Sequence, residues 1–118
     1  MRQTVEYSGA ILAPMVRVGT LPTRLLSLKE GATLVYTEEI IDHRLMNCKK
    51  FEISNNGVDW IDFKLSDVDN PVFQTCSEEK NKVILQLGTA SPQRAVKAAK
   101  LVQDYIAGID VNMGESRH

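Results

Sequence analysis

Two side-chain amides stand within or just after short apolar runs of the chain. Gln86 is the polar residue of the run at residues 83–87, and Asn112 follows the run at residues 109–111. An amide offers both a hydrogen-bond donor and an acceptor, which suits the imide edge of a heterocyclic ligand. The alternative for Gln86 is a solvated side chain on a strand whose faces alternate.

Charged residues follow the other apolar runs. Glu39 comes after the run at residues 34–36, and its alternative is a surface acid in the first turn of the next helix, where the dipole favours it. Asp110 shares a face with Asn112 in a regular strand, where it would order that edge or act as a buried structural acid. Five cations could approach RNA phosphates, although we expect all but the first to be solvated: Arg17, Arg24, Arg44, Lys49 and Lys50.

These side chains need strands and helices that bring them together. Short apolar runs predict core strands near residues 10–13, 34–36, 83–87 and 108–112. Helices are predicted near residues 21–29 and 91–106, since each segment opens with a hydroxyl residue and a proline and is followed by a glycine. Alternation of strands and helices predicts an α/β fold with parallel core strands.

The middle of the chain is less regular. The pair Asn56-Gly57 lies between two apolar segments and predicts a hairpin turn. Residues 72–75 predict a further strand after a turn at residues 67–71. A short helix is predicted from the apolar residues Ile40, Ile41, Leu45 and Met46.

Size and composition limit the possible classes of protein. The 118 residues, of which 43% are hydrophobic, fit one ordinary domain, whereas a complete (β/α)8 barrel needs about 250 residues. A net charge of −1 gives no general attraction for RNA. Cys48 and Cys76 lack metal-site spacing and indicate reduced thiols, so we expect no metal and a cytoplasmic protein. No apolar run approaches the ~20 residues that span a bilayer.

Three segments carry a resemblance to a known family. They read APMVRVGTLP at residues 13–22, GATLVYTEE at residues 31–39 and IDVNMG at residues 109–114. Together they resemble the tRNA-dihydrouridine synthases, and among these the eukaryotic type that modifies position 20 of the D-loop. The resemblance implies an α/β fold that is the N-terminal half of a TIM (β/α)8 barrel. Residues 1–118 would then be part of its FMN-binding domain.

The resemblance also implies a reaction and roles for single residues. Enzymes of this family use NADPH to reduce FMN, and the flavin then reduces a flipped-out uridine of tRNA to 5,6-dihydrouridine. Flavin contacts are implied for Pro14, Met15, Val16, Glu39 and Gln86. Asn112 is implied to lie beside the flavin and the uracil, and Arg17 is a candidate contact to the tRNA.

The chain departs from the family at its catalytic acid. Family members follow the Asn-x-Gly with a cysteine that protonates the uracil, and Glu115 stands in that place here. The later barrel strands, their phosphate-binding glycines and the helical domain that grips tRNA are also missing. We therefore expect weak FMN binding and no activity of this chain alone. The alternative is a non-catalytic remnant or a binding module that regulates a full-length paralogue, with a partner or a second copy covering the open half barrel.

Overall fold

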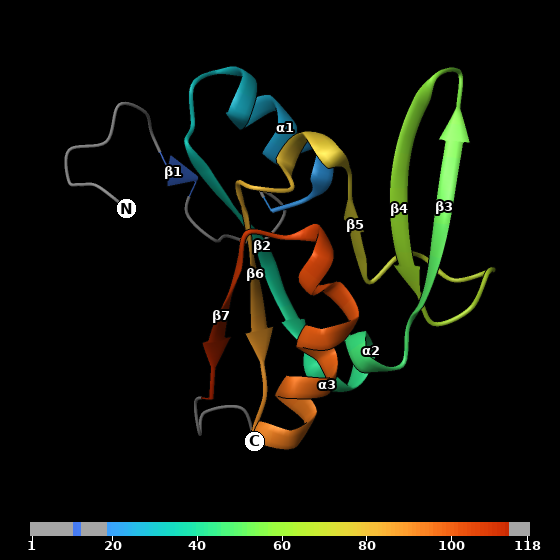
Figure 1. Ribbon diagram of the computed structural model, residues 1–118, viewed down its shortest axis with the longest axis vertical. Helices are drawn as coiled ribbons and strands as arrows, with labels where there is room; N and C mark the ends of the chain where they lie inside the picture. Colours follow the sequence, from blue (N-terminus) through green and yellow to red (C-terminus); the bar gives the residue numbers. More distant parts are fainter. Residues whose placement is uncertain (1–10, 13–18, 114–118) are drawn as a thin grey trace.

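Four parallel strands form the central sheet. The computed structural model describes residues 11–12 and 19–113. In this part of the chain the strand order is β1 (Ile11–Leu12), β2 (Leu34–Ile41), β6 (Val83–Gly88) and β7 (Gly108–Asn112). All four strands are labelled in Figure 1. Each neighbouring pair is parallel. The predicted core strands are confirmed within the described residues.

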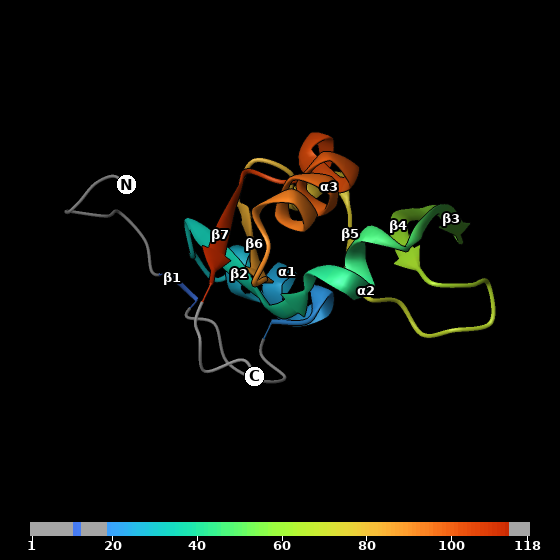
Figure 2. The same cartoon turned by 90° about the horizontal axis from the view of Figure 1, so that it is seen from below.

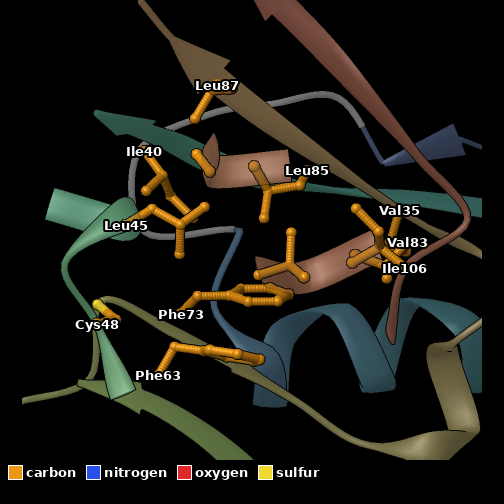
Figure 3. Close-up of a cluster of buried hydrophobic side chains, with 12 residues drawn as sticks. Val35, Ile40, Leu45, Cys48, Phe63, Phe73, Val83, Leu85, Leu87 and Ile106 are labelled. Atoms are coloured by element: carbon orange, nitrogen blue, oxygen red, sulfur yellow. The ribbon is translucent and has the colours of Figure 1, made fainter. Parts of the chain in front are cut away.

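In the described part of the chain, three α-helices pack on one face of this sheet. They are α1 (Leu21–Lys29), α2 (Asp42–Met46) and α3 (Pro92–Val102), and Figure 2 shows them on the same side of the strands. Val83, Leu85 and Leu87 of β6 point into this layer and are fully buried. Leu45 of α2 lies in the same cluster, as Figure 3 shows. The α3 residues Ala98 and Val102 also belong to it. A parallel sheet with helices on one face is consistent with part of a TIM barrel, as predicted.

The helix boundaries follow from the residues at their ends. Gly31 lies just after α1 with φ of 110°, a conformation that favours glycine. The Ser91 hydroxyl accepts a hydrogen bond from the Arg94 N–H at 3.3 Å and caps α3. This helix ends at Val102 and continues as the 3-10 turn η2 (Gln103–Tyr105), so the prediction of helix near residues 91–106 is confirmed in its main part. Among the described residues, no helix is long and apolar enough to cross a membrane.

A second, antiparallel sheet is inserted between α2 and β6. Its strands are β3 (Lys49–Asn55), β4 (Val58–Lys64) and β5 (Phe73–Thr75), followed by the 3-10 turn η1 (Ser77–Glu79). Asn56 and Gly57 join β3 to β4 with φ of 53° and 79°, the backbone that a tight hairpin turn requires. The predicted hairpin and the strand near residues 72–75 are therefore confirmed. Phe63 and Phe73 stack at 5.7 Å and join this sheet to the core.

The short helix after β2 starts later than the sequence predicts. Ile40 and Ile41 belong to β2, where they pair with Leu87 and Gly88 of β6, and only Asp42 begins α2. The prediction that both isoleucines are helical was wrong. Pairing with β6 overrides the local pattern, since it buries Ile40 in the core.

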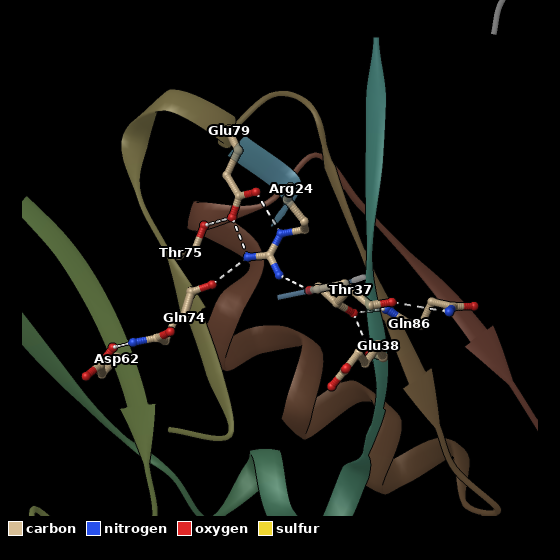
Figure 4. A network of polar contacts seen from close by, with 9 residues as sticks. Arg24, Thr37, Glu38, Asp62, Gln74, Thr75, Glu79 and Gln86 are labelled. Carbon is tan, nitrogen blue, oxygen red and sulfur yellow. Dashed lines mark hydrogen bonds and ion pairs between the residues drawn. The ribbon is translucent and has the colours of Figure 1, made fainter. Parts of the chain in front are cut away.

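Arg24 of α1 lies inside the molecule, whereas the sequence indicated a solvated cation. Its Nε and Nη2 donate to the two carboxylate oxygens of Glu79 at 2.8 and 2.7 Å. Nη2 also donates to the Gln74 carbonyl at 2.7 Å, and Nη1 donates to the Gly19 carbonyl (Figure 4). The Arg24 and Glu79 side chains are only 3% and 0% exposed. The pair therefore ties α1 to the segment around β5 and η1.

Candidate functional site

The predicted polar residues line the face of the sheet that the helices leave uncovered. In the strand register Glu39 of β2 lies beside Gln86 of β6, which lies beside Asp110 of β7. The next row lies two residues further toward the carboxyl ends of the strands and consists of Ile41, Gly88 and Asn112. Paired residues of parallel strands point to the same face, so these two rows form one surface. We call this surface the rim, because it lies at the carboxyl edge of the sheet.

An irregularity in β2 decides which glutamate joins the rim. Tyr36 pairs with Ile84, and the next recorded pair is Glu39 with Gln86. Between these pairs β2 advances by three residues and β6 by two, so β2 contains one extra residue. The extra residue reverses the alternation of faces and places Glu39, rather than Glu38, beside Gln86. Thr37 occupies the bulge, and its hydroxyl accepts the Gln86 backbone N–H at 2.9 Å. This contact satisfies a backbone donor that the shifted register would otherwise leave unpaired.

Gln86 is half-buried and tied to the same bulge. Its Nε2 donates to the Thr37 carbonyl oxygen at 3.3 Å. Figure 4 shows this contact between the Gln86 amide and Thr37. An amide in this place presents one donor and one acceptor edge to a ligand lying over the rim. Gln86 is therefore only partly solvated, and its contact with a ligand stays a prediction.

Glu39 and Asn112 meet at the carboxyl end of the rim. Asn112 Nδ2 donates to Glu39 Oε1 at 3.4 Å, although the two residues are 73 positions apart in sequence. The other Glu39 oxygen lies over Gly88, because a Cβ built on Gly88 would come within 2.4 Å of it. A side chain at position 88 would therefore displace the Glu39 carboxylate from this place. The alternative prediction of Glu39 as an acid in a helical turn was wrong, since Glu39 lies in β2.

Asp110 shares a face with Asn112, as predicted for a regular strand. It is exposed, so the alternative prediction of a buried structural acid at this position was wrong. The side chain lies in the same row as Glu39 and Gln86. Two carboxylates and an amide therefore span three neighbouring strands.

A buried acid behind the rim was missed by sequence reasoning. Asp42 is 2% exposed, and its Oδ2 accepts hydrogen bonds from the Thr89 hydroxyl at 2.5 Å and from Arg94 Nε at 3.0 Å. Its Oδ1 accepts the His43 N–H at 2.6 Å. Burial would raise the pKa of Asp42, but the hydrogen bonds from Thr89, Arg94 and His43 outweigh it and lower that pKa. An acid directly after an apolar strand and at the start of a helix was the available signal.

Several predicted site residues cannot be placed. Pro14, Met15, Val16, Arg17 and Glu115 lie outside the described residues. The predictions made for them stay predictions.

The other candidate RNA-binding cations lie on the surface. Arg44, Lys49 and Lys50 are exposed, as expected for solvated residues. Lys50 Nζ contacts the Glu52 carboxylate at 3.2 Å and the Tyr105 hydroxyl at 2.8 Å. These contacts are local to the antiparallel sheet and η2, and none of them reaches the rim.

Comparison with known proteins identifies the family. A family model described as dihydrouridine synthase (Dus) matches residues 64–114. A tRNA-dihydrouridine(20) synthase of Schizosaccharomyces pombe is 45% identical over 97% of this chain and 24% of its own length. The Saccharomyces cerevisiae protein of the same name is 41% identical over 97% of this chain and 31% of its length. A tRNA-dihydrouridine(16/17) synthase of Saccharomyces cerevisiae is 34% identical over 88% of this chain and 21% of its length.

The names of these relatives also carry NAD(P)+. The chain spans between a fifth and a third of their length. The match of residues 64–114 to the family model takes in β6, α3 and β7, the elements that carry Gln86 and Asn112. On these findings the chain belongs to the dihydrouridine synthase family.

Proposed function

We propose that this chain is part of an FMN-dependent tRNA-dihydrouridine synthase, which reduces a D-loop uridine to 5,6-dihydrouridine with NADPH as reductant. The observation that carries the proposal is the meeting of Glu39, Gln86 and Asn112 at the carboxyl edge of a parallel sheet. Barrel enzymes build their active sites at this edge. The two relatives named for position 20 are 45% and 41% identical, against 34% for the relative named for positions 16 and 17, so position 20 is the proposed target.

The polar groups of the rim fit the imide edge of a flavin ring. That edge presents one N–H between two carbonyl oxygens, and so needs both donors and acceptors. The Gln86 amide offers both, the Asn112 amide adds a donor and the Glu39 carboxylate adds an acceptor. Gly88 has no side chain of its own, and the Glu39 carboxylate extends over it. Bound FMN would supply the hydride for uracil, while the protein groups orient the ring and the base.

The proposed roles of the residues follow from their positions. Glu39 and Gln86 orient the flavin, and Asn112 at the end of β7 holds the uracil beside it. Pro14, Met15 and Val16 are proposed as further flavin contacts from the family resemblance. Arg17 is proposed, on the same basis, to contact the tRNA.

The family's proton-donating cysteine corresponds to Glu115 in this chain. We therefore propose that the chain alone does not complete the reduction. A second candidate function, a non-catalytic module that regulates a full-length paralogue, is favoured by this replacement. The uncovered face of the sheet would then be closed by that partner or by a second copy. We further propose tRNA as a partner, on the family resemblance, and the cytoplasm as the location of the protein.

Complementation tests the proposed activity. The chain is expressed in cells that lack dihydrouridine at position 20 of tRNA, alone or fused to the downstream part of a position-20 relative. We expect no dihydrouridine from the chain alone, very little from the fusion with Glu115, and turnover once the fusion carries Glu115→Cys. Full activity of the fusion with Glu115 in place would show that the cysteine argument is wrong. Absence of activity from the Glu115→Cys fusion would contradict the proposed function.

Fluorescence quenching of FMN tests the cofactor separately. For this chain alone we expect binding weaker than micromolar, because the ring contacts are proposed to be present and the phosphate site is expected in later strands. Micromolar or tighter binding would mean that a second copy or a partner supplies the missing contacts. A mass measurement of the FMN-bound species would then distinguish these sources.

A further inference from the structure

We infer that Asp42 and Thr89 are positioning residues that hold Asn112 in place at the rim. The inference rests on the proposed function, which gives Asn112 its role at the flavin and the uracil. Neither Asp42 nor Thr89 lies in the two rows of the rim. Both act on it from behind, through the loop that joins β6 to α3.

Asp42 fixes this loop through the Thr89 side chain. Thr89 follows Gly88, the last residue of β6, and is 3% exposed. Its hydroxyl donates to Asp42 Oδ2 at 2.5 Å and accepts the Ser91 N–H at 3.0 Å. A hydrogen bond to a buried, ionised carboxylate is about twice as strong as one between neutral groups. The carboxylate therefore holds Thr89 in one place relative to α2.

Arg94 completes the support of the carboxylate. Its Nε donates to the same Asp42 oxygen at 3.0 Å from the first turn of α3. The Asp42 side chain is 3% exposed and the Arg94 side chain 33% exposed, so the cation screens the acid from one side. Asp42 thus connects the start of α2, the loop after β6 and the start of α3. All three segments lie at the carboxyl edge of the sheet.

A backbone hydrogen bond from Thr89 restrains the position of Asn112. The Thr89 backbone N–H donates to the Asn112 carbonyl oxygen at 3.1 Å, just past the last paired residues of β6 and β7. The Asn112 side chain is held from the other direction by Glu39 at 3.4 Å. One contact places the backbone of Asn112 and the other orients its amide. Loss of the Thr89 hydroxyl should therefore loosen the backbone contact while Glu39 stays in place.

The test compares three variants of the full chain by NMR. Thr89→Val keeps the shape of the side chain and removes the hydroxyl, whereas Thr89→Ser keeps the hydroxyl. Ser91→Ala is the matched control, because it removes the cap of α3 in the same loop and has no direct bond to Asn112. The readouts are the Asn112 side-chain amide signals and the rate of hydrogen exchange of the amide at position 89.

For Thr89→Val we expect shifted Asn112 signals and about tenfold faster exchange at position 89, the effect of one lost hydrogen bond. Thr89→Ser should resemble the unchanged protein. Ser91→Ala should lower the melting temperature without moving the Asn112 signals. Unchanged signals in Thr89→Val, or equal shifts in Ser91→Ala, would overturn the inference. If Thr89→Val does not fold, the isosteric Asp42→Asn variant takes its place with the same expectation.

An FMN titration of the same proteins separates this inference from the proposed function. If the chain binds FMN, Thr89→Val should weaken binding by about tenfold and Thr89→Ser should not. If the unchanged chain shows no FMN binding at any concentration, the proposed function fails in this chain. The NMR comparison then still decides whether Asp42 and Thr89 position Asn112.

Discussion

The two faces of the parallel sheet differ in what they hold, although they are built from alternate residues of the same strands. On β6 the residues Val83, Leu85 and Leu87 face the helices and have no exposed surface. Between them, Ile84 and Gln86 point to the uncovered face, where Gln86 lies beside Glu39 and Asp110. The covered side, with its helices and the buried Arg24–Glu79 pair, should determine stability. The rim should determine binding, and neighbouring positions should separate the two properties.

The largest loss of stability is expected from breaking the buried ion pair on the covered side. Arg24→Met leaves the fully buried Glu79 carboxylate without its cation, which costs about 3–5 kcal/mol of unfolding free energy. Arg44→Met, at an exposed arginine of α2, is the control and should change it by less than about 0.5 kcal/mol. Urea unfolding measures both.

The double variant Arg24→Met with Glu79→Leu tests why the single variant loses stability. It separates the contribution of the ion pair to the unfolding free energy from the cost of burying an unpaired charge. It should recover most of the lost stability, since two apolar side chains of similar volume no longer bury a charge. A loss as large as in Arg24→Met would show that the hydrogen bonds to Gln74 and Gly19 matter more than the charge. The stability of the covered side would then depend on the hydrogen bonds of Arg24 rather than on the pairing of a buried charge.

Truncation in the apolar layer should come next in size. Leu85→Ala removes a fully buried side chain and leaves a cavity, for an expected loss of about 2–5 kcal/mol in urea unfolding. Val96→Ala on α3 is the control, because Val96 is 53% exposed and should change stability by less than about 0.5 kcal/mol. Equal losses in the two variants would contradict the assignment of the core to the face that carries Leu85.

The sequence predicts the covered face better than the rim. Apolar runs such as residues 83–87 identify strands because burial on the helix side demands a continuous stretch of aliphatic residues. The bulge at Thr37 has no such pattern, so the choice between Glu38 and Glu39 could not be derived from residue types alone. Only the register of two strands distant in sequence decides it.

Charged residues in the interior show the same limit. Arg24 was expected to be solvated because its partner Glu79 lies 55 positions away, within a polar segment that gave no sign of burial. Asp42 was missed because its three donors come from α2, the loop after β6 and α3. A sequence gives the charge of a residue but not the partners that allow its burial.

On the rim, Gln86→Ala should affect binding more than folding. Where the chain binds FMN, alone or completed by a partner, we expect the affinity to fall by about 1–3 kcal/mol, the cost of leaving polar groups of the ring unpaired. Unfolding free energy should change by only about 1 kcal/mol or less, because Gln86 is half-buried with one long bond to Thr37. Gln103→Ala, at an exposed amide on η2, is the control for both measurements. A large loss of stability with unchanged FMN affinity in Gln86→Ala would show that this residue of the rim determines folding rather than binding.

The smallest expected effect is a pH dependence at Asp42, where the covered side meets the rim. The hydrogen bonds from Thr89 and Arg94 hold the folded-state pKa of Asp42 below the ordinary value of 3.8. The unfolded chain therefore takes up the proton at higher pH than the folded chain. The stabilisation is complete above pH 3.8 and is lost as the pH falls toward and through the folded-state pKa.

Urea unfolding of the unchanged protein and of Asp42→Asn should show a gap in stability at neutral pH that shrinks in acid. Asp110→Asn, at the exposed acid of the rim, should give a much smaller gap at neutral pH. A gap for Asp42→Asn that is the same at every pH would mean that the shape of the side chain, and not its charge, holds the loop after β6.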